Sequence, residues 1–233
     1  MMPIDNNYKK GQLMDYRAVI FDLDGTLLDT LEDLADSVNL ILQRNNLPGH
    51  GLHNYRYFIG DGLTNLVRRA LPAKLADDVD TVSNYVTALG EEYDRRWANK
   101  TRPYPGISEL LQGLKNRGVK TAVFTNKPDT VAQKVIQHFF PDIPFETVRG
   151  SFPAQPIKPD PTGALVIARE MQIPPEQFLY LGDTGTDMKT ANAAGMYPVG
   201  VLWGFRTGEE LAQNGAKILL ERPEQLLDKN VFL

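Results

Sequence analysis

The chain has 233 residues, of which 42% are hydrophobic and 23% are charged, a composition typical of an ordinary globular protein. Its formal net charge of -4 argues against the basic surface that nucleic acids and anionic membranes attract, so neither is an expected partner. The absence of cysteine excludes disulfides, thiolate metal sites and cysteine nucleophiles, and it fits a cytoplasmic protein.

Residues 1–14 are polar and lack the apolar stretch of a signal peptide, so we expect a flexible extension, with Met14 as an alternative start. No apolar run reaches the roughly 18 residues that a membrane-spanning helix needs. The oligomeric state cannot be inferred from the sequence, and a monomer and a homodimer are both compatible with it.

Four short runs rich in β-branched and aromatic residues predict strands that are buried on both faces, as in a parallel sheet. They are Arg17–Leu23, Lys120–Thr125, Gln177–Gly182 and Tyr197–Leu202. Helical patterns lie between them, at Ile107–Arg117, Thr130–Phe139, Pro161–Met171 and Asp187–Ala194. This alternation predicts an α/β fold with a Rossmann-like, doubly wound parallel sheet and right-handed crossovers.

One long segment interrupts the alternation. From about residue 30 to residue 103 no buried strand is predicted, and apolar residues recur at helical spacing. Helices are expected at Leu31–Leu42, Leu63–Leu71 and Leu75–Trp97, and the prolines and glycine of Pro103–Gly106 end the segment. We therefore expect a core domain of residues 15–29 and 104–233, with a helical domain of residues 30–103 inserted after the first strand.

Two carboxylates stand at the end of the first predicted strand, Asp22 and Asp24, followed by Gly25. In open parallel sheets, ligands bind at the carboxyl ends of the strands. Two acids flanking one residue repel each other and require a counter-ion. The alternative is that the Asp-Gly pair only forms a turn after the strand.

Other polar side chains follow later strands. Thr125 and Asn126 end the second predicted strand, Asp183 ends the third with Asp187 four residues later, and Lys158 precedes a predicted helix. Taken singly, the threonine and the acids could cap helices, and the lysine could lie on the surface.

Together these side chains provide the groups that phosphoryl transfer requires. Carboxylates at two strand ends can hold Mg²⁺, and the metal, a lysine and a helix N-terminus can neutralise phosphate oxygens. One carboxylate can attack phosphorus, and a second can protonate the leaving alcohol and later activate water.

The sequence resembles the haloacid dehalogenase superfamily, and its phosphatases in particular. Asp22-Leu23-Asp24-Gly25-Thr26 is similar to the first motif of that family. Thr125 matches the second motif, Lys158 the third, and Asp183 with Asp187 the fourth. The dehalogenases of the superfamily lack the second aspartate of the first motif and do not use Mg²⁺, so Asp24 indicates phosphate chemistry.

The resemblance implies a role for each motif residue. Asp22 would be the nucleophile and a metal ligand, and Asp24 would be the acid/base and a ligand through its main-chain carbonyl. Asp183 would complete the metal ligands with support from Asp187. The residues implied to hold the phosphoryl group are Thr125, Asn126 and Lys158.

The helical insertion resembles the mobile cap that closes over small substrates in this family. Its segment Phe58–Leu63, with Arg69–Leu71, is similar to the corresponding part of phosphoglycolate phosphatases. The resemblance implies that Gly60 and Gly62 of this chain let the backbone approach the substrate. An ordinary inter-helix turn is the alternative.

The segment Trp203–Arg206 is also similar to those relatives. Trp203 and Phe205 are expected to pack, and Arg68, Arg69 and Arg206 are candidates for binding a substrate carboxylate. The histidines lie outside every motif, and we expect no chemistry from His50, His53 and His138.

The expected function is that of a magnesium-dependent phosphatase acting on a small phosphorylated metabolite through an aspartyl-phosphate, with 2-phosphoglycolate as the leading substrate. Sugar phosphates, nucleoside monophosphates and pyrophosphate remain alternatives. A β-phosphoglucomutase-like phosphomutase would use Asp22 and Asp24 in the same way. A receiver-like signalling domain lacks the two-aspartate motif and the helical cap, which argues against it.

Overall fold

The computed structural model describes residues 16–228, and the extension expected over residues 1–14 lies outside them. A six-stranded sheet has the order β5-β4-β1-β6-β7-β8, and every neighbouring pair is parallel. The strands are β1 (Ala18–Phe21), β4 (Lys120–Pro128), β5 (Thr147–Ser151), β6 (Phe178–Gly182), β7 (Tyr197–Val201) and β8 (Ile218–Leu220). The predicted doubly wound parallel sheet is confirmed.

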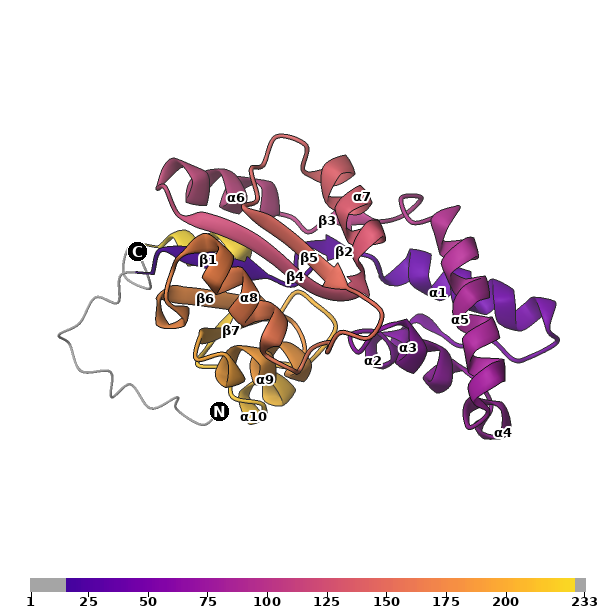
Figure 1. Ribbon diagram of the computed structural model, residues 1–233. Coiled ribbons are helices and arrows are strands. Elements are labelled where there is room, and N and C mark those ends of the chain that lie inside the picture. Colours follow the sequence, from indigo (N-terminus) through magenta and orange to yellow (C-terminus); the bar gives the residue numbers. More distant parts are fainter. Residues whose placement is uncertain (1–15, 229–233) are drawn as a thin grey trace.

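Helices cover both faces of this sheet (Figure 1). Val19 and Phe21 of β1 pack toward α6 (Ile107–Asn116) and α7 (Asp129–Phe139), whereas Ala18 and Ile20 pack toward α8 (Thr162–Met171) and α9 (Gly185–Ala193). This alternation buries both faces of the strand and explains why its sequence is continuously apolar. Three short helices complete the core: α10 (Gly208–Gln213) and the 3₁₀ helices η1 (Pro175–Gln177) and η2 (Pro223–Leu227).

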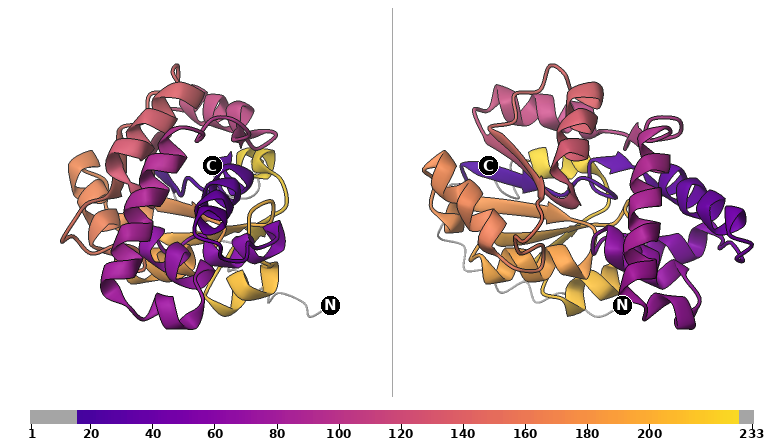
Figure 2. Two further views of the ribbon diagram at one scale, coloured as in Figure 1. Left: turned by 90° about the vertical axis from the view of Figure 1, so that its right-hand side faces the viewer. Right: turned by 45° about the vertical axis from the view of Figure 1, so that its right-hand side comes forward.

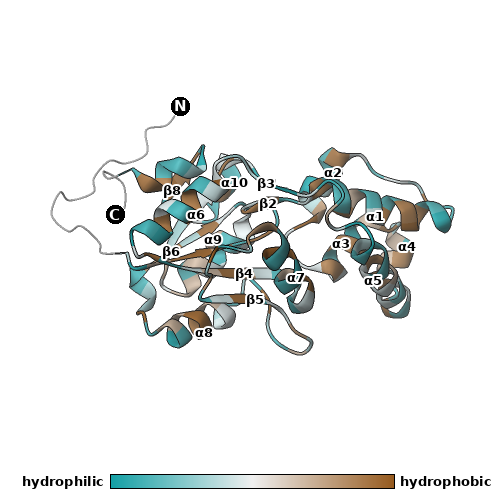
Figure 3. Ribbon diagram, turned by 90° about the horizontal axis from the view of Figure 1, so that it is seen from above, coloured by the Kyte–Doolittle hydropathy of each residue, from teal (hydrophilic) through white to brown (hydrophobic). Residues whose placement is uncertain are grey.

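A separate group of helices, which we call the helical lobe, projects beyond the carboxyl ends of the central strands (Figures 1 and 2). It comprises α1 (Leu31–Arg44), α2 (Leu52–Phe58), α3 (Leu63–Ala70), α4 (Ala73–Ala76) and α5 (Val79–Asp94). The apolar faces of these helices form a hydrophobic cluster distinct from the two on the sheet. Each lobe helix carries both apolar and polar residues (Figure 3), as expected of helices that share a small core.

The single helix expected over Leu75–Trp97 is wrong, because α4 ends at Ala76 and α5 begins at Val79. Asp78 has an extended backbone, and its carboxylate accepts a hydrogen bond of 2.5 Å from the Thr81 hydroxyl. Such local bonding by aspartate competes with helix continuation and starts a new helix instead.

The two chain segments that join the lobe to the core run side by side. β2 (Leu28–Asp29) and β3 (Arg102–Pro103) form a two-stranded antiparallel pair. Among residues 16–228, none of the helices combines the length and the apolar character needed to cross a bilayer.

Candidate active site

The sequence-predicted polar residues meet at the carboxyl edge of the sheet. Asp22 directly follows β1, Thr125 and Asn126 lie near the end of β4, and Asp183 directly follows β6. A cavity of about 30 Å³ lies between this edge and the helical lobe. Its lining from the core is Asp22, Asp24, Thr125, Asn126 and Lys127, and its lining from the lobe is Leu34, Ile59, Gly60, Gly62, Leu63 and Leu66.

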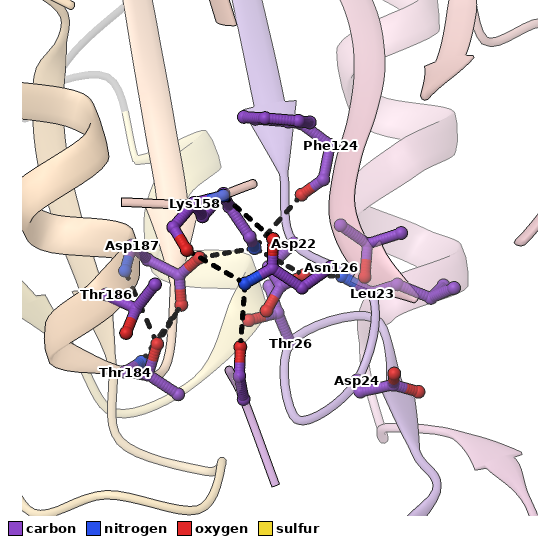
Figure 4. A network of polar contacts seen from close by, with 12 residues as sticks. Asp22, Leu23, Asp24, Thr26, Phe124, Asn126, Lys158, Thr184, Thr186 and Asp187 are labelled. Atoms are coloured by element: carbon purple, nitrogen blue, oxygen red, sulfur yellow. Dashed lines mark hydrogen bonds and ion pairs between the residues drawn. The ribbon is translucent and has the colours of Figure 1, made fainter. Parts of the chain in front are cut away.

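Lys158 connects two of the carboxylates (Figure 4). Its Nζ lies 2.8 Å from Oδ1 of Asp22, 2.7 Å from Oδ1 of Asp187 and 3.2 Å from the carbonyl oxygen of Phe124. Asp22 Oδ1 also accepts a hydrogen bond of 2.7 Å from the amide of Leu23. These contacts orient Asp22 through Oδ1, and no hydrogen bond or ion pair between described residues engages Oδ2.

Asp183 is fully buried beside this pair. Its Oδ1 accepts a hydrogen bond of 3.0 Å from the Thr26 hydroxyl, and its Oδ2 accepts one of 2.9 Å from the amide of Phe205. Both donors come from loops at the carboxyl edge of the sheet. The carboxylate is thus fixed in orientation before any ligand binds.

Asp187 serves the helix and the site at once. In the first turn of α9, Thr184 and Asp187 form a capping box in which Asp187 Oδ2 accepts a hydrogen bond of 3.1 Å from the amide of Thr184. The other oxygen of Asp187 faces Lys158. Asp183 or Thr184 was the capping candidate from the sequence, and Thr184 is the residue that caps α9.

The charge balance of this cluster calls for a cation. Carboxylate oxygens of Asp22, Asp183 and Asp187 all lie within 4.8 Å of one another, whereas Lys158 supplies one positive charge. Burial, and then the charge of Asp187, raise the pKa of Asp22 to about 7. Burial also raises the pKa of Asp183 well above its usual range, as do the charges of Asp187 and Asp22. A buried, all-oxygen donor set with excess negative charge fits a hard divalent cation such as Mg²⁺.

Asp24 lies apart from this cluster, and its side chain is not joined to Asp22 (Figure 4). Its two oxygens lie 2.8 and 3.0 Å from Nζ of Lys127, a residue that the sequence analysis did not single out. Lys127 Nζ also lies 4.7 Å from the centre of the Tyr93 ring in the lobe. Burial alone would lower the pKa of Lys127, but the charge of Asp24 and the contact with Tyr93 raise it, so Lys127 is positively charged.

The side-chain amide of Asn126 joins the lobe to the core through hydrogen bonds to both. Its side-chain nitrogen donates to the carbonyl oxygens of Gly60 and Lys158, each at 3.1 Å, and its Oδ1 accepts from the amide of Lys158 at 2.9 Å. Thr125 Oγ1 accepts a hydrogen bond of 3.2 Å from the amide of Lys127. Thr125 and Asn126 line the cavity together with Asp22, and Lys158 contacts both Asn126 and Asp22.

Residues 59–62, which connect α2 and α3 and which we call the lobe loop, place two glycines at the cavity. Gly60 and Gly62 have φ values of 122° and 84°, which side-chain-bearing residues rarely adopt. Arg69 pairs with Asp61 and donates to the carbonyl oxygen of Phe58, and Arg206 donates to that of Ile59 at 2.9 Å.

The remaining candidates lie outside the cavity lining. Arg68 is exposed on α3, whereas Phe205 packs in the lobe cluster and Trp203 Nε1 donates to the carbonyl oxygen of Thr26 at 2.9 Å. The histidines make packing contacts: His50 and His53 contact aromatic residues of α2, and His138 contacts Trp97 and Phe139.

Comparison with known proteins identifies the family. The sequence model of a family described as haloacid dehalogenase-like hydrolase matches residues 19–201. The chain belongs to the haloacid dehalogenase-like hydrolases. The matched span begins in β1 and ends in β7, so it includes the helical lobe and every residue of the carboxylate cluster.

Similar members of this hydrolase family are named phosphoglycolate phosphatases. The one from Pseudomonas putida is 32% identical over 213 residues, which cover 91% of this chain and 78% of the relative. The one from Psychrobacter arcticus is 33% identical over 207 residues, which cover 86% and 89%. A crystal structure of a predicted phosphoglycolate phosphatase from Haemophilus somnus superposes with a TM-score of 0.85 at 30% identity, covering 93% of this chain and 98% of that one. The chain is accordingly a phosphatase, a hydrolase of phosphoric monoesters.

Proposed function

We propose that this phosphatase hydrolyses a small phosphate monoester through a phosphorylated Asp22 and requires Mg²⁺. The carrying observation is the buried cluster of Asp22, Asp183 and Asp187, whose carboxylate oxygens lie within 4.8 Å of one another while one lysine pairs with two of them. In a purely structural role these carboxylates would lie buried and repel one another, which raises the pKa of Asp22 and of Asp183. A bound divalent cation together with a phosphate ester would balance their charge.

When bound, Mg²⁺ would be held by Asp22 and Asp183, by the main-chain carbonyl of Asp24 and with the support of Asp187, and it would neutralise phosphate oxygens during transfer. Lys158, already positioned at Asp22, would contact the same phosphoryl group. Thr125 and the main-chain amide of Asn126 would complete the phosphate site.

The proposed reaction has two steps. An oxygen of Asp22 attacks phosphorus, the bond from phosphorus to the ester oxygen breaks, and Asp24 gives its proton to that oxygen to release the alcohol. Asp24 then takes a proton from water, whose oxygen bonds to phosphorus while the bond from phosphorus to Asp22 breaks. The products are the alcohol, inorganic phosphate and the original enzyme.

The proposed substrate is 2-phosphoglycolate, the compound for which the relatives are named. A cavity of about 30 Å³ has room for about two water molecules beside the catalytic groups, which suits a leaving group of a few atoms.

We further propose that residues 30–103 act as a cap that opens and closes over a core of residues 15–29 and 104–233. The joint would be the β2–β3 pair, where both connecting segments meet. Contacts from Asn126 and Arg206 to lobe carbonyl groups would hold the closed form, which excludes bulk water.

The experiment that tests the proposal measures phosphate release from a panel of small phosphate esters, with and without Mg²⁺, beside Asp22→Asn. We expect magnesium-dependent release that favours 2-phosphoglycolate and falls by at least about a thousandfold in Asp22→Asn. Comparable release by the variant would contradict the aspartyl-phosphate. Isomerisation of a hexose phosphate without phosphate release would instead establish the phosphomutase alternative.

A further inference from the structure

Lys127 is a buried cation that faces the cavity and that the proposed reaction does not yet use. Its side chain is 3% exposed, and the carboxylate of Asp24 that it contacts through both oxygens is 13% exposed. Among residues 16–228, no carboxylate other than that of Asp24 forms a salt bridge with it. Lys127, Asp24 and the nucleophile Asp22 all line the same cavity.

This pairing places Asp24 in the wrong position for its proposed work. As general acid, Asp24 must reach the ester oxygen of a phosphate held at Asp22, but both of its carboxylate oxygens are paired with Lys127. Figure 4 shows no contact between its side chain and Asp22. If Asp24 moved away and nothing replaced it, the charge of Lys127 would remain buried without a counter-ion, which is strongly unfavourable. Asp24 can therefore leave at low cost only when another anion takes its place.

The cavity offers a substrate anion few other partners. Of the described residues that line it, Lys127 is the one cation, and the lobe contributes apolar side chains and the loop backbone. Of the three arginines considered from the sequence, Arg68 is exposed on α3, and Arg69 and Arg206 donate to the carbonyl oxygens of Phe58 and Ile59. Lys158 is already engaged by Asp22 and Asp187.

We propose that Lys127 exchanges partners during the catalytic cycle: a carboxylate on the leaving-group side of the substrate replaces Asp24 at Nζ, and the displaced Asp24 turns to the ester oxygen. This inference rests on the proposed phosphatase function and names its substrate class, the phosphate esters of short hydroxy acids. Lys127 is then the residue that selects the substrate and positions the acid. With a phosphate ester of the same size whose leaving group carries no charge, Asp24 stays paired with Lys127, and the ester reacts without acid assistance from Asp24.

A matched pair of esters tests the exchange. 2-Phosphoglycolate and 2-hydroxyethyl phosphate differ by a carboxylate against a hydroxymethyl group and share a primary alkyl leaving oxygen. For the wild type we expect kcat/KM to favour 2-phosphoglycolate by about 100-fold. In Lys127→Met the ratio should approach one, whereas Lys127→Arg, which keeps the charge, should retain part of the preference. Lys120→Met, which removes an exposed lysine paired with Glu146 inside the core, is the control and should keep the full ratio.

The Asp24→Asn variant separates partner exchange from a merely structural role of Lys127, because only the exchange predicts different losses of kcat on the two esters. Its kcat for 2-phosphoglycolate should fall by about 100-fold, and its kcat for 2-hydroxyethyl phosphate should fall much less, because the acid assists the first ester and not the second. Equal losses on both esters, or an unchanged ratio in Lys127→Met, would overturn the exchange while leaving the phosphatase intact. If neither ester is hydrolysed and no other ester of the panel is, the proposed function itself has failed.

Discussion

Gly25 shows how narrow the tolerances around the carboxylate cluster are. It follows Asp24 with a φ of 87°, and a Cβ atom on it would lie 2.2 Å from Oδ2 of Asp183. No side chain fits at that distance, so any substitution must displace Asp183. The glycine of the Asp-x-Asp-Gly motif therefore shapes the carboxylate cluster as well as the turn.

We predict that Gly25→Ala raises the Mg²⁺ concentration for half-maximal activity by about tenfold or more, because it moves a carboxylate of the site. Gly118→Ala is the matched control, since Gly118 has a φ of 70° with nothing within 4 Å of its added Cβ. Both variants should lose about 1 kcal/mol of stability through backbone strain. Mg²⁺ activation curves and thermal melts separate the two effects, and equal Mg²⁺ dependence in both variants would contradict the prediction.

The raised pKa of Asp22 predicts how the metal-free protein responds to pH. Burial, followed by the charge of Asp187, raises this pKa from 3.8 to about 7, so the native state retains a proton that the unfolded chain has already released. Stability must then fall as the pH rises between these two values.

We expect the Tm of the metal-free wild type to fall by several degrees between about pH 5 and pH 8, and to fall less in Asp22→Asn. Mg²⁺ should stabilise the wild type more at the higher pH, where the carboxylates are ionised and repel each other. Melts in EDTA and in Mg²⁺ provide the measurement. A Tm that rises over this range in EDTA would show that Asp22 is not buried in its neutral form.

At the scale of elements, the connection between lobe and core depends on one buried carboxylate. Asp33, in the first turn of α1, is 1% exposed and accepts hydrogen bonds from the amides of Lys100 and Thr101, at 2.9 and 2.8 Å to its Oδ2. It also accepts a hydrogen bond of 2.8 Å from the Thr101 hydroxyl. The start of the lobe is thereby fastened to the segment that leaves it.

We predict that Asp33→Ala lowers the free energy of unfolding by about 3 kcal/mol, because it leaves buried amide groups without an acceptor. Asp36→Ala is the control on the same helix, since Asp36 pairs with Lys100 at 2.9 Å and has an exposed side chain. Its loss should stay below about 1 kcal/mol. Urea unfolding measures both, and similar losses would show that Asp33 does not fasten the connection.

The success of sequence-based prediction follows the burial of each element. β1, β4, β6 and β7 were predicted because both of their faces are covered, which makes their sequences continuously apolar. β5 and β8 are the outer strands of the sheet; β5 reads Thr-Val-Arg-Gly-Ser and is mostly half-buried, and β8 has three residues, so neither gives a clear pattern. The helices α2 and α10 were not predicted, because each is short and buries a single residue, which gives no apolar periodicity.

The sequence revealed the site residues that belong to motifs at strand ends, but not the residue whose role depends on distant parts of the chain. Asp22, Thr125, Lys158 and Asp183 stand out because motif position and strand ends coincide in the sequence. Lys127 does not, because its significance depends on Asp24, 103 residues away, and on the lobe packed above it. Its position directly after Thr125-Asn126 at a strand end was the one signal available in the sequence.

At the scale of the whole molecule, polar contacts join the lobe to the core around the lobe loop, and the ion pair of Lys134 with Asp94 joins them elsewhere. Besides the bonds from Asn126 and Arg206, the Thr186 hydroxyl donates to Asp61 at 2.6 Å. Burial alone would raise the pKa of Asp61, but hydrogen bonds from Thr186 and Arg69 lower it, which keeps this acceptor ionised. Breaking these contacts would let the lobe move away from the core, as the proposed cap requires.

The geometry offers a direct way to lock the lobe. A Cβ on Gly60 would lie 3.9 Å from Cβ of Thr184 in the core, within the range that disulfides span. Because the natural sequence contains no cysteine, a Gly60→Cys, Thr184→Cys double variant would carry one defined pair of thiols. The positive φ at Gly60 and the lost helix cap at Thr184 will lower stability by about 1–3 kcal/mol, so the reduced double variant is the proper reference.

We predict that oxidation of this double variant abolishes hydrolysis and that dithiothreitol restores the activity of the reduced form. Each single variant should be insensitive to oxidation, which rules out an effect of the thiols themselves. Retained activity in the fully oxidised protein, with the disulfide verified by mass spectrometry, would mean that substrate enters without separation of lobe and core. Loss of activity on oxidation alone would place lobe opening inside the catalytic cycle, because the reduced double variant already carries the altered contact between position 184 and Asp187 and differs from the oxidised form only by the disulfide.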